Sequence, residues 1–269
     1  MGYIDFMGVL RMKRDNRLML FDTSVLKDEE VFLKFYEKMT KERRKRIDAL
    51  KPEGSKRLCL GAGILLDRAV REYLATDYSK QLLSSSDYEI ATGPQGKPYI
   101  KGLNDFSFNL SHSGDMAVIA VSDREVGVDI QKIKHFKDSL VDHVFNIEDK
   151  KLAKELVAEL AGTGLTADDA QHDDSSFDRV YTRMWAMKES VMKYTGKGLS
   201  LDPKIITLKR VQFSEHTSSI VAYLDSREYS ERRLFIQECD ALQGQDSFYG
   251  ISVCSDYEVF AKGSEIVTL

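Results

Sequence analysis

The sequence has little cysteine and proline and no long apolar run. Its 269 residues include three cysteines, four prolines and one tryptophan. Cys59, Cys239 and Cys254 lie far apart and form no CxxC or Cys/His pattern. This usage argues against a disulfide framework or a zinc site and favours a reducing compartment. The opening stretch MGYIDFMGVL is too short and too interrupted for a signal peptide or a membrane span. We therefore expect a cytoplasmic protein without a membrane partner.

A large net charge is also missing. The chain has 39 Lys and Arg against 43 Asp and Glu, a formal charge of -4. A protein that binds nucleic acid with its whole surface is usually basic, so the composition speaks against nucleic acid as the partner. The length fits one large domain or two small ones, and it suffices to bury a core without staples.

The chain does contain an alternation of helical and strand-like patterns. The apolar spacing predicts helices over 28–50, 55–76, 147–160 and 177–194, and strands over 106–110, 116–121 and 126–130. Further antiparallel strand candidates follow residue 205, and the polar stretch 161–176 predicts a mobile loop. Each half places helices before a small set of strands. This order predicts an α+β fold of two similar lobes, residues 1–124 and 125–269.

The segment REVGVDIQKI, residues 124–133, places two oxygen-bearing side chains on one strand face. Side chains alternate along a strand, so Asp129 and Gln131 point together, away from Val128 and Ile130. Carboxylate and amide oxygens are ligands that Mg²⁺ prefers. Taken alone, the segment fits a strand with a solvated polar face at least as well as a metal site.

The helical segment YTRMWAMKESVMKYTGKGLS, residues 181–200, sets Glu189 at the edge of an apolar stripe. Lys193 follows one turn later. Such a carboxylate can ligate a metal, act as a base, or form an ordinary i,i+4 pair with the lysine. The segment alone favours the ordinary pair.

Two further segments carry groups that suit phosphate. FNLSHSGD, residues 108–115, has Ser111 and His112 where a strand turns, although adjacent strand residues face opposite ways and so do not form a Ser-His catalytic pair. The run KERRKR at 41–46, with Lys56 and Arg57 after it, fits a phosphate site, a nucleic-acid patch or a solvated helix face.

The order and spacing of these segments are more specific than any one of them. GKP at 96–98, NLSHS at 109–113, VGVDIQ at 126–131 and WAMKESVMKYTGKGLS at 185–200 follow one another along the chain. In these motifs the chain resembles the 4'-phosphopantetheinyl transferase family, of the longer monomeric type that primes peptide and polyketide synthases. The likeness covers roughly residues 40 to 215.

The resemblance implies two α+β lobes related by a pseudo-twofold, with coenzyme A in the cleft between them. It implies that Asp129 and Glu189 hold Mg²⁺, or Mn²⁺ in its place, and that Lys193 contacts the phosphates. Gln131 stands where many relatives carry glutamate, so direct metal contact there is in question. The coenzyme A contacts implied by the resemblance are Lys41, Arg44, Lys56, Arg57, Lys97, Ser111 and His112.

The implied reaction transfers the phosphopantetheine arm of coenzyme A to a serine of an apo acyl or peptidyl carrier protein. Glu189 is the first candidate for the base that takes the serine proton, with a metal-bound hydroxide or Glu148 in reserve; Glu148 is also a candidate for the metal site. A non-catalytic coenzyme A or carrier-protein module on the same fold is the alternative function. A nucleic-acid binder using KERRKR ranks behind both, because it leaves the WAMKES segment unexplained.

Overall fold

The structure is a computed structural model of the chain. It describes residues 16–75, 88–160, 174–214, 217–225, 233–239, 249–258 and 265–269, together with the short strands β1 (Tyr3–Ile4) and β2 (Leu10–Arg11). Most of the loop predicted over 161–176 lies outside these residues, and its last part begins a helix at Asp174. Within the described ranges, no helix is both long and apolar enough to cross a bilayer.

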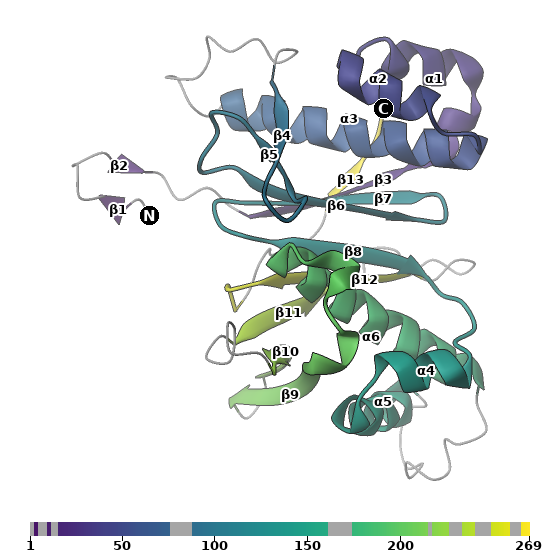
Figure 1. Ribbon diagram of the computed structural model, residues 1–269, viewed down its shortest axis with the longest axis vertical. Coiled ribbons are helices and arrows are strands. Elements are labelled where there is room, and N and C mark those ends of the chain that lie inside the picture. Colours follow the sequence, from purple (N-terminus) through teal and green to yellow (C-terminus); the bar gives the residue numbers. More distant parts are fainter. Residues whose placement is uncertain are drawn as a thin grey trace.

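The first lobe is a four-stranded sheet covered on one face by a long helix (Figure 1). Its elements in chain order are β3 (Arg17–Asp22), η1 (Thr23–Lys27), α1 (Glu29–Tyr36), α2 (Lys41–Asp48), α3 (Glu53–Ala75), the β4–β5 hairpin (Ile90–Thr92, Pro98–Ile100), β6 (Ser107–Ser113) and β7 (Met116–Ser122). With β13 (Glu265–Val267) from the end of the chain, the sheet order is β13-β3-β7-β6. The apolar face of α3 packs on this sheet and forms the first core, which includes Leu65, Val70, Phe21 and Phe108.

The second lobe is a five-stranded antiparallel sheet with α6 across it. Its elements are β8 (Gly127–Lys132), α4 (Asp138–Val144), α5 (Ile147–Leu160), α6 (Asp174–Thr195), η3 (Gly198–Ser200), η4 (Pro203–Ile205), β9 (Ile206–Ser214), β10 (Thr217–Leu224), β11 (Leu234–Glu238) and β12 (Tyr249–Ser255). The sheet order is β8-β12-β11-β10-β9. The buried stripe of α6, with Met184, Met187 and Val191, forms the second core. The prediction of an α+β fold with small antiparallel sheets is confirmed.

A third core joins the lobes. The face of the first sheet that points away from α3 contributes Leu18, Leu20 and Val118, and the second sheet contributes Val128 and Val253. β8 therefore runs beneath β6 and β7 as the layer next to them (Figure 1). The burial of apolar groups from both sheets makes the junction part of the folded interior rather than a hinge between separate bodies.

The segment predicted as one helix over 28–50 is two helices. α1 begins after Asp28, whose carboxylate accepts from the Glu30 and Val31 amides at 2.9 and 3.1 Å. α2 begins after Thr40, whose hydroxyl accepts from the Arg43 amide at 3.3 Å. A capping side chain starts a new helix at Thr40, and the periodicity alone did not reveal it.

The boundary between lobes also differs from the predicted one in one respect. The sequence analysis assigned all residues after 125 to the second lobe. The last strand, β13 (Glu265–Val267), instead pairs in parallel with β3 in the first sheet. Val267 is buried in the first core, which supplies the apolar reason for this return.

The backbone of α6 lies directly against β8 at Gly127, which has no side chain. A Cβ on Gly127 would lie 2.0 Å from the carbonyl oxygen of Ser190 and 2.4 Å from the amide nitrogen of Tyr194. Both are backbone atoms of the helix, which cannot give way easily. The glycine of the VGVDIQ motif thus sets the distance at which α6 presents its side chains to β8.

Candidate active site at the junction of the lobes

A polar cluster forms where β6, β8 and α6 meet. The Lys193 ammonium donates to the Asp129 carboxylate at 2.6 Å and to the Ser111 hydroxyl at 2.8 Å. The Ser111 hydroxyl donates to the same Asp129 oxygen at 2.7 Å. Asp129 is buried and Ser111 nearly so, whereas the Lys193 side chain is 27% exposed. The cluster is therefore closed on the strand side and open at the lysine.

Gln131 links the carboxylates of the cluster. Its amide nitrogen donates to Asp129 Oδ2 at 3.0 Å and to Glu189 Oε2 at 2.6 Å. The amide group stands between two carboxylates that come from a strand and a helix. The predicted shared face of Asp129 and Gln131 is thus what the structure contains, and Glu189 reaches it from α6.

The carboxyl group of Glu189 has a raised pKa. Burial and the nearby charge of Asp129 raise the pKa of its carboxyl to about 7, against the opposing effect of Lys193. At neutral pH this group therefore exchanges its proton readily. Perturbation of this kind at a cluster of charged groups is a property of catalytic sites.

The donor set suits a magnesium ion. Asp129 and Glu189 aim oxygens at one point, and rotation of the Gln131 amide would add its carbonyl oxygen. Mg²⁺ commonly takes one or two protein carboxylates and completes its shell with water and substrate phosphates. Within the described ranges, no three His, Cys, Asp or Glu side chains gather as a metal group. The site thus offers two carboxylates and leaves most positions for other oxygens.

His112 lies next to the cluster but on the other face of β6. Phe108 and Leu110, which share its strand face, pack toward α3. His112 is exposed overall, but partial desolvation of its ring by neighbouring protein atoms and the charge of Lys193 lower the pKa of His112 below its ordinary value. The neutral imidazole is thus favoured at neutral pH, and it can donate one N–H to an anion.

Lys97 links the lobes instead of joining the cluster. Its ammonium pairs with Glu125 and donates to the Val126 carbonyl at 2.8 Å and to the Tyr194 carbonyl at 3.4 Å. These acceptors lie at the start of β8 and the end of α6. A contact between Lys97 and coenzyme A stays a prediction.

The four basic residues of α2 and α3 lie on the first lobe, apart from the cluster. Lys56 pairs with Glu53 at 2.7 Å, and Lys41 is exposed. In the part of the chain that is described, the Nε atom of Arg57 is the one buried side-chain nitrogen or oxygen without a hydrogen-bond partner. No hydrogen bond between described residues connects Lys41, Arg44, Lys56 or Arg57 with Asp129 or Glu189. Their role toward a ligand stays a prediction.

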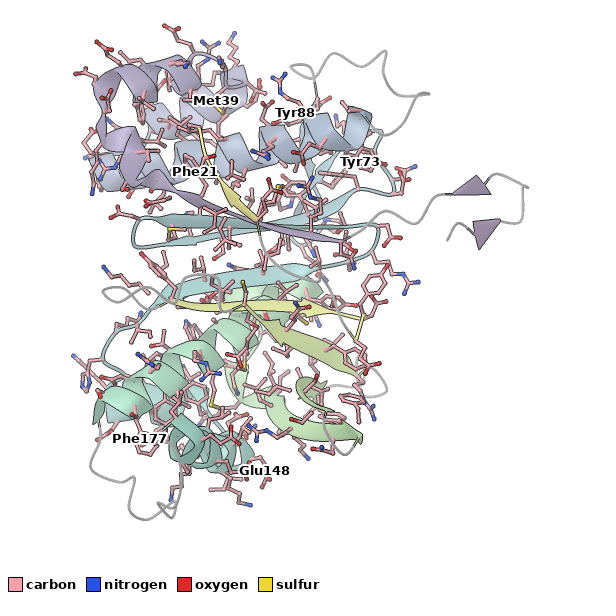
Figure 2. The ribbon with its side chains drawn as sticks, turned by 180° about the vertical axis from the view of Figure 1, so that it is seen from behind. Phe21, Met39, Tyr73, Tyr88, Glu148 and Phe177 are labelled. Atoms are coloured by element: carbon pink, nitrogen blue, oxygen red, sulfur yellow. The ribbon has the colours of Figure 1, made fainter. Side chains whose placement is uncertain are left out.

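The structure does not bring Glu148 to the cluster. Glu148 lies on α5 at the far end of the second lobe from β6 and β8 (Figure 2). Its carboxylate pairs with Lys151 at 2.9 Å, and this hydrogen bond lowers the pKa of the exposed acid. Glu148 is therefore too far from Glu189 to take a proton from a serine bound there.

The next residue, Asp149, is the buried acid of this turn. Its carboxylate accepts from Lys188 Nζ at 2.6 Å, from the Asn146 amide at 2.9 Å and from the Leu208 amide at 2.9 Å. Lys188 also donates to the carbonyls of Val144, Pro203 and Ile206 at 3.2, 2.8 and 2.7 Å. The Lys188–Asp149 pair thus connects α6 with α5 and β9, at the helix position next to Glu189.

The sequence held a signal for this pair that the analysis missed. Lys188 follows Met184 by four residues and precedes Val191 by three, so it lies on the apolar stripe of α6. A charge at such a position requires a buried partner. The partner's identity was not readable, because Asp149 lies 39 residues away.

Comparison with known proteins supports the sequence resemblance. Residues 125–243 match the model of the 4'-phosphopantetheinyl transferase superfamily. A 4'-phosphopantetheinyl transferase of Bacillus subtilis is 34% identical over 173 residues, which are 64% of this chain and 65% of the relative. The 4'-phosphopantetheinyl transferase Sfp of Bacillus subtilis strain 168 is 34% identical over 138 residues, 51% of this chain and 53% of Sfp. The L-aminoadipate-semialdehyde dehydrogenase-phosphopantetheinyl transferase of Xenopus laevis is 28% identical over 181 residues, 65% of this chain and 52% of the relative.

The region that carries Asp129, Gln131, Glu189 and Lys193 matches the model of the 4'-phosphopantetheinyl transferase superfamily. The chain is also similar to 4'-phosphopantetheinyl transferases of Bacillus, among them Sfp. These similarities agree with the resemblance found in the sequence. The chain spans between about half and just under two thirds of the length of these relatives.

Proposed function

We propose that the protein transfers the 4'-phosphopantetheine group of coenzyme A to a serine of an apo acyl or peptidyl carrier protein. The serine oxygen forms a bond to the β-phosphorus of coenzyme A. The bond from that phosphorus to the oxygen shared with the α-phosphate breaks, and 3',5'-ADP leaves. The serine proton passes to a carboxylate of the enzyme. Atoms and charges balance without any oxidant or reductant.

One observation carries the proposal. Asp129 and Glu189 converge on the Gln131 amide, and Lys193 lies 2.6 Å from Asp129 at the open side of the same cluster. Phosphoryl transfer depends mainly on positioning and on neutralising negative charge. A cluster of two carboxylates and a lysine from the second lobe, held against Ser111 of the first lobe, supplies both functions for a diphosphate.

The side chains divide the work as follows. Asp129 and Glu189 would hold Mg²⁺, with Mn²⁺ as an alternative, and Gln131 would complete the face through its carbonyl oxygen. Bound there, the ion would neutralise charge on the diphosphate. Lys193 has partners among the described residues for two of its three N–H groups, so the third can donate to a phosphate oxygen.

Glu189 is the proposed base. In the metal-free protein its pKa is about 7, near the pH at which a general base is most effective, and Mg²⁺ on the same carboxylate would lower that pKa and weaken the base. The Ser111 hydroxyl donates one hydrogen bond and accepts from Lys193 and from the Ile130 amide at 3.4 Å. These three bonds use its capacity, so we assign Ser111 to orienting Asp129 and Lys193.

The first lobe would bind the 3'-phosphate end of coenzyme A. The His112 side chain is exposed at the end of β6, and the charge of Lys193 contributes to lowering its pKa, so the neutral ring could donate an N–H to a phosphate. Arg57 brings a buried Nε that lacks a protein partner among the described residues, which suits a bound anion. Lys41, Arg44, Lys56 and Lys97 are the proposed further cations. The transferase acts in this proposal as a cytoplasmic monomer, with neither nucleic acid nor a membrane as a partner.

Intact-mass analysis tests the reaction. An apo carrier protein is incubated with the enzyme, coenzyme A and Mg²⁺, beside an EDTA control and the Glu189→Ala variant. The proposal predicts a mass gain of one phosphopantetheine group that both controls abolish. Measurable coenzyme A binding without transfer to any of a panel of carriers would favour the non-catalytic module.

A further inference from the structure

β6 and β8 meet at the junction without pairing as strands. β6 pairs with β7, and β8 pairs with β12 on its other edge. Three side chains of β6 instead reach the backbone of β8. Asn109 Oδ1 accepts from the Val128 amide at 3.0 Å, Ser111 Oγ from the Ile130 amide at 3.4 Å, and Ser113 Oγ from the Lys132 amide at 2.9 Å. We call Asn109, Ser111 and Ser113 the junction rungs.

The spacing of the junction rungs is two residues on both strands. Side chains at every second position of a strand share one face, so all three rungs leave β6 on the side that faces β8. The amides at 128, 130 and 132 likewise share one edge of β8, the edge that is turned away from β12. The rungs therefore replace a missing neighbour strand along residues 128–132 of β8.

The rungs bracket the site. The three amides that they hold lie on either side of Asp129 and Gln131, and Ser111 is itself part of the polar cluster. A shift of β8 by a fraction of its residue spacing would move Asp129 away from Ser111 and Lys193. The position of both metal-facing side chains thus depends on where the rungs hold the strand.

Apolar packing does not supply this precision. The core between the sheets, with Leu20, Val118 and Val128 among its members, keeps the lobes in contact. Burial of apolar area is non-directional and tolerates small sliding movements. Hydrogen bonds at fixed spacing have a preferred distance and angle, so they define the register of β8 against β6.

We infer that Asn109 and Ser113 are positioning residues for this site. They hold β8 at the register in which Asp129 and Gln131 face Glu189 and Lys193, and they fix these groups relative to the anion-binding side chains of the first lobe. This role rests on the proposed function, because it concerns the binding of coenzyme A and Mg²⁺ at the cluster. Neither residue touches the reacting atoms.

The test compares variants of the full chain. Asn109→Ala and Ser113→Ala each remove one acceptor, and Ser113→Thr keeps the hydroxyl. Ser122→Ala is the matched control, because Ser122 is a buried serine of the same sheet whose hydroxyl donates to Asn16 at 2.9 Å, away from β8. Two readouts are needed: amide hydrogen exchange at Val128 and Lys132, and the affinity for coenzyme A with Mg²⁺ by calorimetry, with kcat where transfer is observed.

We expect Asn109→Ala to speed exchange at Val128 and Ser113→Ala to speed exchange at Lys132. Each should weaken Mg²⁺-dependent binding of coenzyme A by about tenfold or more, because small displacements of positioned groups are costly. Ser113→Thr should restore both readouts, and Ser122→Ala should leave both near wild type at a similar loss of thermal stability.

Two results would overturn the inference. Unchanged exchange in both alanine variants would mean that the rungs are not formed in solution. Faster exchange with unchanged coenzyme A affinity would mean that they only add stability. Failure of the proposed function is a separate result, since wild-type protein that binds coenzyme A with Mg²⁺ but transfers nothing still reports on both readouts.

Discussion

Two lysines of the same helix pair with aspartates at the same distance, yet their surroundings differ. Lys188 Nζ lies 2.6 Å from Asp149, and Lys193 Nζ lies 2.6 Å from Asp129. Lys188 is wholly buried and donates to three backbone carbonyls in addition to the Asp149 carboxylate. Lys193 is partly exposed and donates to one hydroxyl in addition to the Asp129 carboxylate. The hydrogen-bonding capacity of Lys188 is used up, whereas two of the three N–H groups of Lys193 have partners among the described residues and the third faces the open side of the cluster.

The comparison shows that two lysines of one helix have different roles. Burial lowers the pKa of Lys188, and the charge of Asp149 opposes that effect. Asp149 also accepts two backbone amides, so removal of either partner would strand a charge in the interior. The Lys193 pair can exchange partners without that penalty, because solvent and a ligand can reach the ammonium. We expect Lys188 to govern stability and Lys193 to govern activity.

The largest effect should come from Lys188→Ala. This change leaves the Asp149 carboxylate buried without its cation, and it should lower the free energy of unfolding by about 3–5 kcal/mol. Lys193→Ala should lower it by less, because the Asp129 carboxylate keeps the Ser111 hydroxyl and the Gln131 amide as donors and water can replace the partly exposed ammonium. Urea denaturation of both variants gives the comparison, and equal losses would contradict the separation of roles.

The second effect is the reverse contrast in activity. Lys193→Ala removes the ammonium that we propose contacts the diphosphate, and Glu189→Gln removes the carboxylate that we propose takes the serine proton. Each should reduce kcat by about 10²–10³ while the protein stays folded. Release of 3',5'-ADP measures the rate. Near-normal turnover of either variant would remove that residue from the chemistry.

A smaller effect should follow from adding a side chain at the tight contact between α6 and β8. Gly127→Ala would place a methyl group 2.0 Å from the Ser190 carbonyl oxygen, so the helix must move and the protein should lose about 1–3 kcal/mol of stability. Gly93→Ala serves as the control, because its Cβ would meet the Lys97 carbonyl at an ordinary 3.4 Å. Thermal melting of the two variants decides whether this contact is as tight as the structure shows.

The smallest effect concerns pH. The pKa of Glu189, raised to about 7, exceeds the ordinary value of 4.5 for a glutamate, so the metal-free folded protein keeps a proton that the unfolded chain loses. The stability from this group is full below 4.5 and is lost as the pH rises through 7. Mg²⁺ must displace the proton, so its affinity should fall by about tenfold per pH unit below 7. Calorimetric titration at pH 6 and 7.5 measures this, and a pH-independent affinity would exclude Glu189 as a ligand.

The sequence predicted the elements that carry the site better than the contacts around them. The helix over 147–160 agrees with α5, and the strand over 126–130 lies within one or two residues of β8. The period of two also placed Asp129 and Gln131 on a common face. These features depend on local spacing, which a single sequence displays.

Features that depend on distant partners were not readable in this way. The return of Glu265–Val267 to pair with β3 joins the two ends of the chain. The choice of Asp149 over Glu148 as the buried acid depends on where Lys188 points from α6. Asn109 lies on the strand predicted over 106–110 and Ser113 in the turn predicted after it, and the sequence did not show that either holds β8, because their partners are backbone amides of another strand. Backbone partners leave no mark on the composition of a motif.

The most direct test of the account is whether coenzyme A and Mg²⁺ bind together at Asp129. Calorimetry with the wild-type protein and the isosteric Asp129→Asn variant, each with and without Mg²⁺, measures the coupling. We predict that Mg²⁺ tightens coenzyme A binding by about tenfold or more in the wild type and has little effect in the variant. An equal gain in both proteins, or no gain in the wild type, would contradict a shared metal and diphosphate site at the junction of the lobes.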